Sequence, residues 1–249
     1  MTEDALARRR TEGLCATPLE GRMITMGGTP LNERLLVIGN KRYSSWSLRG
    51  WLPLKISGVT FEERLVDLAK ADMKQEIRKF NPAERVPVLV EGSLTIHDSL
   101  AIGEYINEVY AQGQLLPAEK DQRARARSVC AEMHAGFPSL REELPMDLGR
   151  NPNPVDNLSE NCHREIDRIL SLWQQLRQEH HGQGHYLFGA WSLADAALTP
   201  VAARFFHYAI PMGHVPLAEA YCHQTLHLPA FIEWRTAALS EPVYPQFGR

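Results

Sequence analysis

The feature that most constrains the fold is a change of pattern near residue 112. Before it, short apolar runs alternate with segments of helical periodicity, in the order strand, helix, strand, helix, strand, strand, helix. After residue 121 only helical periodicity remains. This predicts a small α/β domain of thioredoxin-like pattern over residues 34–112, a linker containing Gly113 and Pro117, and an all-α domain over residues 121–249.

Apolar spacing also predicts individual elements. The run Leu35–Ile38 indicates a buried strand, and the helix that follows contains Pro53, which should kink it or displace its start. An apolar stripe from Ala126 to Leu144 indicates one long helix. Further helices are predicted around Ile166–Leu176, Leu198–Phe205 and Phe231–Arg235.

Residues 1–33 differ from the rest of the chain. They carry the basic run Arg8–Arg10 and scattered glycine and proline, but no apolar periodicity and no apolar core of a secretory signal. A mitochondrial transit peptide is an alternative, against which Glu3, Asp4 and Glu12 argue. We expect a disordered N-terminal extension, and Met23 or Met26 could be the natural start.

Composition excludes several classes of protein. The formal net charge is −3, so the chain has no basic surplus for nucleic acid, and no apolar run suits a membrane span. The four cysteines are far apart, which argues against disulfides or a cysteine zinc site and favours a reducing, cytoplasmic location. The histidines of the glycine-rich loop 180–185 have no further ligands at suitable spacing, so no metal is expected.

Two serines stand where chemistry is expected. Ser44 and Ser45 lie between the first strand and the first helix, where ligands of α/β domains gather. A helix N-terminus offers free N–H groups and a partial positive charge, which stabilise a thiolate, and a serine hydroxyl adds a hydrogen bond. The alternative is that the serines only cap the helix.

Two later segments could hold the ends of a peptide-like ligand. In Arg85-Val86-Pro87, a cis bond before Pro87 would leave the Val86 backbone open to pair with an extended peptide; the alternative is an ordinary edge strand. Asp98 and Ser99 precede an amphipathic helix, where they could bind an ammonium group and a carboxylate, or simply cap the helix.

Taken together, these segments resemble the glutathione transferase superfamily. The resemblance rests on residues 40–49, 81–89 and 98–102. These segments look like those of a bacterial branch of the superfamily, and the Ser-Ser-x-Ser element is similar to that of the zeta class. It implies that Ser44 or Ser45 activates the glutathione thiol, that Val86 before cis-Pro87 pairs with the cysteinyl backbone, and that Asp98 and Ser99 bind the γ-glutamyl end. Arg85 is a further candidate for glutathione binding. Ser192–Asp195 resembles the superfamily's structural capping motif.

The resemblance predicts a glutathione transferase that directs the thiolate at a small apolar electrophile, with glutathione as co-substrate and no metal. A glutathione-dependent isomerase of the maleylacetoacetate type is an alternative, although Trp46 stands where zeta members usually carry cysteine. A non-catalytic glutathione-binding scaffold is another alternative. A thiol-disulfide oxidoreductase is disfavoured because no cysteine lies at the first helix start. A homodimer without membrane or nucleic-acid partners is implied.

Overall fold

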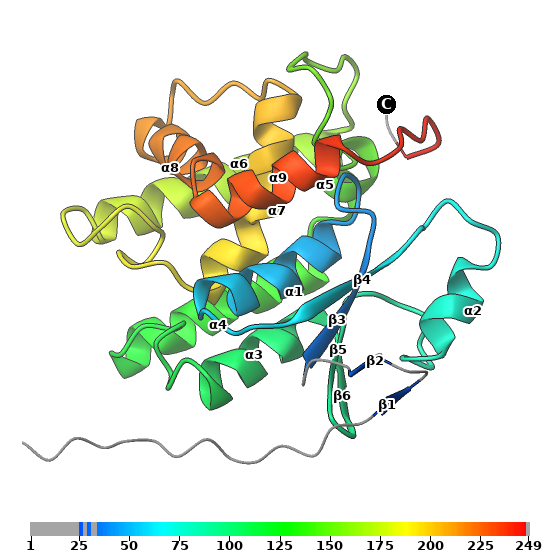
Figure 1. Cartoon of the computed structure of the whole chain (residues 1–249). Helices are drawn as coiled ribbons and strands as arrows, with labels where there is room; N and C mark the ends of the chain where they lie inside the picture. The colour runs from blue at the N-terminus through cyan, green and yellow to red at the C-terminus, as the bar shows by residue number, and fades with distance from the viewer. Residues whose placement is uncertain (1–24, 27–28, 31–33, 248–249) are drawn as a thin grey trace, which may run out of the picture.

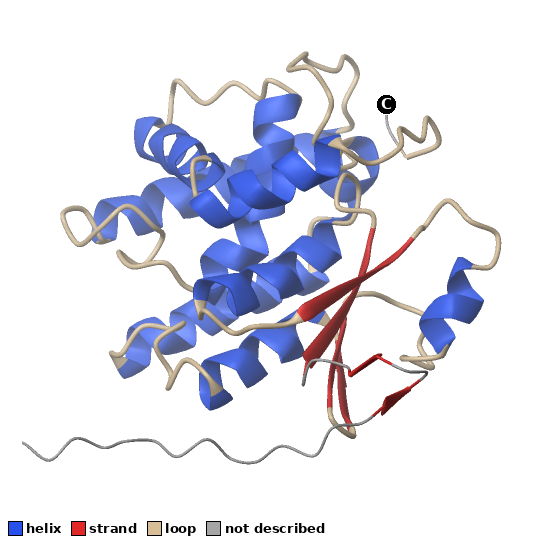
Figure 2. Cartoon of the chain, viewed as in Figure 1, coloured by secondary structure: helices blue, strands red, loops and turns tan. Residues whose placement is uncertain are grey.

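An α/β domain followed by a helical domain is what the sequence pattern predicts, and the computed structural model confirms it (Figures 1 and 2). The structure describes residues 25–26, 29–30 and 34–247. Most of the predicted extension therefore lies outside the described residues. Within it, β1 (Thr25–Met26) and β2 (Thr29–Pro30) pair antiparallel.

The sheet of the first domain has the strand order β4-β3-β5-β6. Its central strand β3 (Arg34–Gly39) runs parallel to β4 (Glu62–Val66) and antiparallel to β5 (Val88–Glu91), which pairs in turn with β6 (Leu94–His97). Successive residues of β3 are fully buried because helices cover both faces of the sheet. Their apolar run is therefore continuous rather than alternating.

Helices α1 (Ser45–Ile56) and α3 (Ser99–Val109) cover one face of this sheet, and the short α2 (Met73–Arg78) covers the other (Figure 1). The helix α1 runs through Pro53 rather than starting after it. It ends at Ile56, and Gly58, just beyond the C-cap Ser57, adopts the left-handed conformation at φ +73°.

The helical domain contains α4 (Lys120–Ala135), α5 (Pro138–Glu143), α6 (Glu160–Glu179), α7 (Leu193–His207), α8 (Pro216–Leu226) and α9 (Pro229–Leu239). The prediction of one long helix up to Leu144 was wrong, because Phe137 adopts a left-handed conformation at φ 58° and Pro138 starts a new helix. Sequence reasoning missed α8, whose buried face is made of small and polar residues beside Tyr221.

The two domains share one hydrophobic core around α1. This helix packs against α3 within its own domain and against α7 and α9 of the helical domain. Trp51 of α1 and Trp234 of α9 meet edge to face with centroids 5.2 Å apart. The start of α1 therefore lies at the junction of the two domains. None of the helices that the structure describes is both long and apolar enough to span a bilayer.

Candidate functional site

The start of α1 forms a hydrogen-bond network of two serine hydroxyls and two backbone amides. Ser44 is the N-cap, and its Oγ accepts a hydrogen bond from the Ser47 backbone N–H at 3.2 Å and lies 2.8 Å from Ser47 Oγ. Ser47 Oγ also accepts from the Gly39 N–H at 3.0 Å. In this arrangement the Ser44 hydroxyl donates to Ser47 Oγ. Because a hydroxyl group can rotate and Ser47 Oγ also carries a proton, a turn of both hydroxyls would let Ser47 donate to Ser44 and leave the Ser44 proton for an outside acceptor.

Ser45 has different surroundings. Its Oγ accepts a hydrogen bond from Arg204 Nη2 of α7 at 3.4 Å, so it faces the helical domain. Both Ser44 and Ser45 are buried. The first turn of α1 contains no acidic residue, so nothing within the helix neutralises the partial positive charge at its start.

The Val86–Pro87 peptide lies directly beside α1, and its bond is cis. A Cβ added at Gly50 of α1 would stand 2.7 Å from Pro87 Cγ and 3.7 Å from Ile102 Cδ1 of α3. The missing side chain at Gly50 therefore lets α1, α3 and the segment before β5 meet. Arg85 is exposed, and its carbonyl accepts a hydrogen bond from Asn81 Nδ2 at 2.9 Å.

At the start of α3, Asp98 is the N-cap with φ 80°, and its Oδ1 accepts from the Leu100 N–H at 2.8 Å. Its other oxygen lies 3.3 Å from Nε2 of His134 on α4, and the His134 ring meets Trp46 edge-on at 5.2 Å. His134 therefore links the two helix starts at which the sequence predicts ligand binding.

A small cavity lies where the two domains meet. Its lining includes Trp46, Arg49, Ser99 and His134, together with apolar residues of α4 and α7. Its volume of about 20 Å³ is room for about one water molecule, so a tripeptide cannot occupy it. We call this small cavity between the two domains the seam; it lies beside the predicted glutathione site and is not that site.

Three arginines gather around this seam, and sequence reasoning missed them as a group. The guanidinium carbons of Arg49 and Arg141 lie 4.6 and 5.7 Å from the Trp46 ring centroid, while Arg204 reaches Ser45. Arg49 and Arg204 are each only 4% exposed. Neither forms an ion pair with a carboxylate in the part of the chain that the structure describes, and both terminal nitrogens of Arg49 lack an acceptor there.

Burial and mutual repulsion act on these cations. Burial, and secondarily Arg141, lowers the pKa of Arg204 to about 10. Burial also lowers the pKa of Arg49, with Arg204 and Arg141 adding to the effect. Arg204 remains protonated at neutral pH, so the arginine cluster (Arg49, Arg141, Arg204) favours negative charge nearby.

The described cysteines offer no nucleophile. Cys130, Cys162 and Cys222 are all buried. Burial raises the pKa of both Cys130 and Cys222 to about 12, so neither is a thiolate at neutral pH. None of the cysteines in the part of the chain that the structure describes lies at the start of α1, so none of these supplies a sulfur there.

The fold, a thioredoxin-like sheet followed by a helical domain, is similar to that of solved glutathione transferases. A family model described as "Glutathione S-transferase, N-terminal domain" matches residues 43–109. A probable maleylacetoacetate isomerase of Vibrio cholerae is 31% identical over 202 residues, covering 76% of this chain and 90% of the relative. The chain therefore belongs to the glutathione S-transferase superfamily.

Solved structures agree with this assignment. A maleylpyruvate isomerase, described as a bacterial glutathione S-transferase of the zeta class, is 26% identical with a TM-score of 0.66, covering 84% of this chain and 100% of that one. A glutathione transferase homologue from Burkholderia with bound glutathione is 25% identical with a TM-score of 0.61, covering 84% and 98% of the two chains. The predicted likeness to the zeta class is confirmed.

Proposed function

We propose that this protein is a glutathione-dependent isomerase that acts on an α,β-unsaturated carboxylic acid. The observation that carries the proposal is the arginine cluster beside the start of α1, where two of the three cations are buried without an ion-pair partner in the described chain. The positive electrostatic potential of this cluster favours an anionic substrate over a neutral apolar one. The names of the relatives, among them maleylacetoacetate and maleylpyruvate isomerases, support the same choice.

In the proposed reaction, the Ser44 hydroxyl donates a hydrogen bond to the glutathione sulfur, and the start of α1 and the arginine cluster favour its thiolate form. The sulfur adds to the double bond of the acid, and the displaced electron pair moves onto the conjugated carbonyl oxygen. Rotation about the resulting single bond and expulsion of the sulfur give the isomer and return the thiolate. The arginine cluster stabilises the oxygen charge of the intermediate.

We assign the glutathione contacts to the predicted residues. The Val86 backbone, beside cis-Pro87, would pair with the cysteinyl backbone, and Asp98 with Ser99 would hold the γ-glutamyl end. The proximity of these segments to α1 supports the assignment, because Pro87 contacts Gly50 and Asp98 is linked through His134 to Trp46. Arg85 stays a candidate for the third residue of the tripeptide.

A transferase that acts on a small apolar electrophile is the second candidate. The observation in its favour is the ring of Trp46, which is half-buried in the first turn of α1 at the position where zeta members usually carry cysteine. This ring offers an apolar, stackable surface to an aryl electrophile.

One comparison of substrates separates these functions. We expect the protein to isomerise maleylacetoacetate. Arg141→Met should raise the KM for this acid about 10-fold, which corresponds to the binding free energy of a typical charge-assisted hydrogen bond. The KM for glutathione should change less than about threefold. Arg125→Met is the matched control, because Arg125 pairs with Glu179 on the surface. Turnover of an aryl halide without isomerisation would establish the transferase, and glutathione binding without any turnover would indicate a scaffold.

The homodimer is part of the same proposal and stays a prediction. Light scattering of the purified protein at micromolar concentration should give twice the chain mass, and the mass of a single chain would contradict it.

A further inference from the structure

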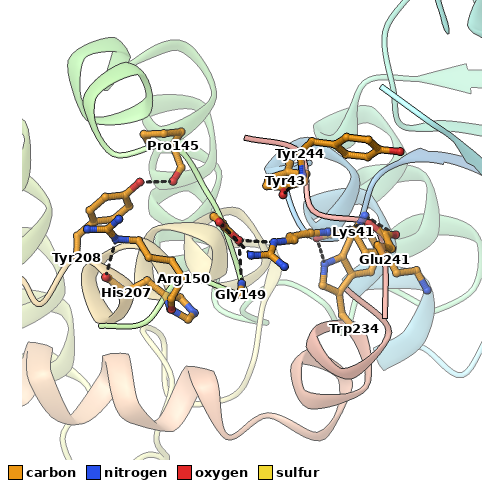
Figure 3. Close-up of polar contacts among 12 residues, drawn as sticks. Lys41, Tyr43, Pro145, Gly149, Arg150, His207, Tyr208, Trp234, Glu241 and Tyr244 are labelled. Atoms are coloured by element: carbon orange, nitrogen blue, oxygen red, sulfur yellow. Dashed lines mark hydrogen bonds and ion pairs between the residues drawn. The ribbon is translucent and has the colours of Figure 1, made fainter. Parts of the chain in front are cut away.

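The residues that follow α9 return to the loop between β3 and α1. We name residues 241–247 the C-terminal clasp (Figure 3). The two carboxylate oxygens of Glu241 accept hydrogen bonds from successive backbone amides, Oε1 from the Lys41 N–H at 2.9 Å and Oε2 from the Arg42 N–H at 3.3 Å. One side chain thus satisfies two loop amides, through charge-assisted bonds of the stronger kind.

The clasp holds the third loop residue as well. The Tyr244 backbone N–H donates to the Tyr43 hydroxyl at 2.9 Å, and the rings of Tyr43 and Phe247 pack with centroids 5.2 Å apart. The Tyr244 hydroxyl donates to Asp67 Oδ2 at 2.7 Å, which ties the clasp to the segment after β4. Each residue of the loop 41–43 therefore contacts the clasp.

This loop leads directly into the proposed catalytic serine. The Ser44 N–H donates to the Asn40 carbonyl at 2.8 Å across the loop, so the path of residues 41–43 sets where Ser44 and the first turn of α1 stand. Trp234 of α9 adds a bond from Nε1 to the Lys41 carbonyl at 2.9 Å (Figure 3). Without Glu241, two amides of this loop would lose their described acceptors.

We infer that Glu241 is a positioning residue, which fixes the loop 41–43 so that the Ser44 hydroxyl and the start of α1 are aimed at the sulfur of bound glutathione. The inference rests on the proposed function. The ligand-bearing part of the site then depends on a segment about 200 residues away in the sequence.

The sign of one pKa distinguishes positioning from simple charge. Removing a nearby negative charge makes it easier to form a thiolate, so a purely electrostatic effect of Glu241→Ala would lower the pKa of the bound thiol. Loss of positioning weakens the hydrogen bond from Ser44 and the interaction with the helix start, and therefore raises that pKa. The two explanations predict opposite results.

The test follows thiolate absorbance of the glutathione complex against pH, together with steady-state kinetics. We expect Glu241→Ala to raise the thiol pKa by about 0.5 to 1 unit and to lower kcat about 3- to 10-fold below that pKa. The KM for glutathione should stay within about twofold. Glu241→Gln, which keeps one acceptor, should show a smaller change of the same sign. An unchanged or lowered thiol pKa in Glu241→Ala would overturn the inference.

The matched control is Ser240→Ala, whose hydroxyl contacts the Thr236 carbonyl at 3.4 Å rather than the loop. It should behave as the wild type. Hydrogen exchange of the Lys41 and Arg42 amides is the readout that does not need activity. We expect exchange at least about tenfold faster in Glu241→Ala, as for an amide that loses its acceptor. Wild-type protein that binds no glutathione would defeat the proposed function, whereas unchanged amide exchange would defeat the clasp.

Discussion

Helices α1 and α7 pack against each other, and each has a serine as its N-cap. The two helix starts differ in the groups that accept hydrogen bonds there. At α7, the Asp195 carboxylate accepts from the Ser192 N–H at 2.8 Å, the Ser192 hydroxyl at 2.9 Å and the Leu187 N–H at 3.1 Å. At α1, only hydroxyl groups occupy the corresponding places, with Ser47 three residues after Ser44.

The difference lies in where the negative charge comes from. A carboxylate built into the first turn of α7 balances the helix dipole and makes that start self-contained. Hydroxyls satisfy N–H groups without bringing charge, so the start of α1 still attracts an anion from outside. The same capping position thus serves stability in one helix and, by our proposal, catalysis in the other.

The largest effect should follow from removing the carboxylate of α7. Asp195 is fully buried, and Asp195→Ala would leave two backbone N–H groups and one hydroxyl without their acceptor. We expect a loss of about 3 kcal/mol or more in the free energy of unfolding, measured by urea denaturation. Ser44→Ala should cost only about 1 kcal/mol. A smaller loss for Asp195→Ala than for Ser44→Ala would break the comparison.

The pH dependence of stability should sharpen it. Burial raises the pKa of Asp195 from 3.8 to about 6 in the folded protein, so between these values the folded state holds a proton that the unfolded state has released. The contribution of this group is therefore most favourable below about pH 4 and is lost as the pH rises through 6, by up to about 3 kcal/mol. The check is the difference between wild type and Asp195→Asn, which lacks this titration, across pH 4 to 7.

The smallest effect concerns the two serines of α1. Ser44→Ala should raise the pKa of bound glutathione by about 1 unit, or about 1.4 kcal/mol, because one hydrogen bond to the thiolate is lost. Ser45→Ala should change it less, since its hydroxyl faces Arg204. Spectroscopic titration of the thiolate with each variant measures both. An effect confined to Ser45→Ala would reverse our assignment.

Local signals in the chain were enough to predict most of the fold. Apolar periodicity located the elements of the α/β domain, in the order that the structure shows. The break at Phe137 was missed because the apolar spacing continues across it, and only the Gly136-Phe137-Pro138 triplet indicated a turn. The helix α8 was missed because a helix buried on a face of small residues shows little periodic contrast.

The candidate site was less predictable. The serines, Val86–Pro87 and Asp98–Ser99 follow from positions at strand and helix ends, which are local properties. The arginine cluster and the clasp are not local, because Arg49 and Arg204 meet only when α1 packs on α7, and Glu241 reaches Lys41 only after the chain has passed through the whole helical domain. In the sequence, each of these arginines taken alone indicates only an ordinary surface position.

The contact between Gly50 and Pro87 has a consequence for any ligand that spans the site. Only hydrogen atoms separate the backbone of α1 from the proline ring at that point. This close packing fixes the distance between the serines at the helix start and the Val86 peptide. A ligand that contacts both must therefore match that distance. Selectivity for the length of the ligand would then come from the packing of α1 on Pro87.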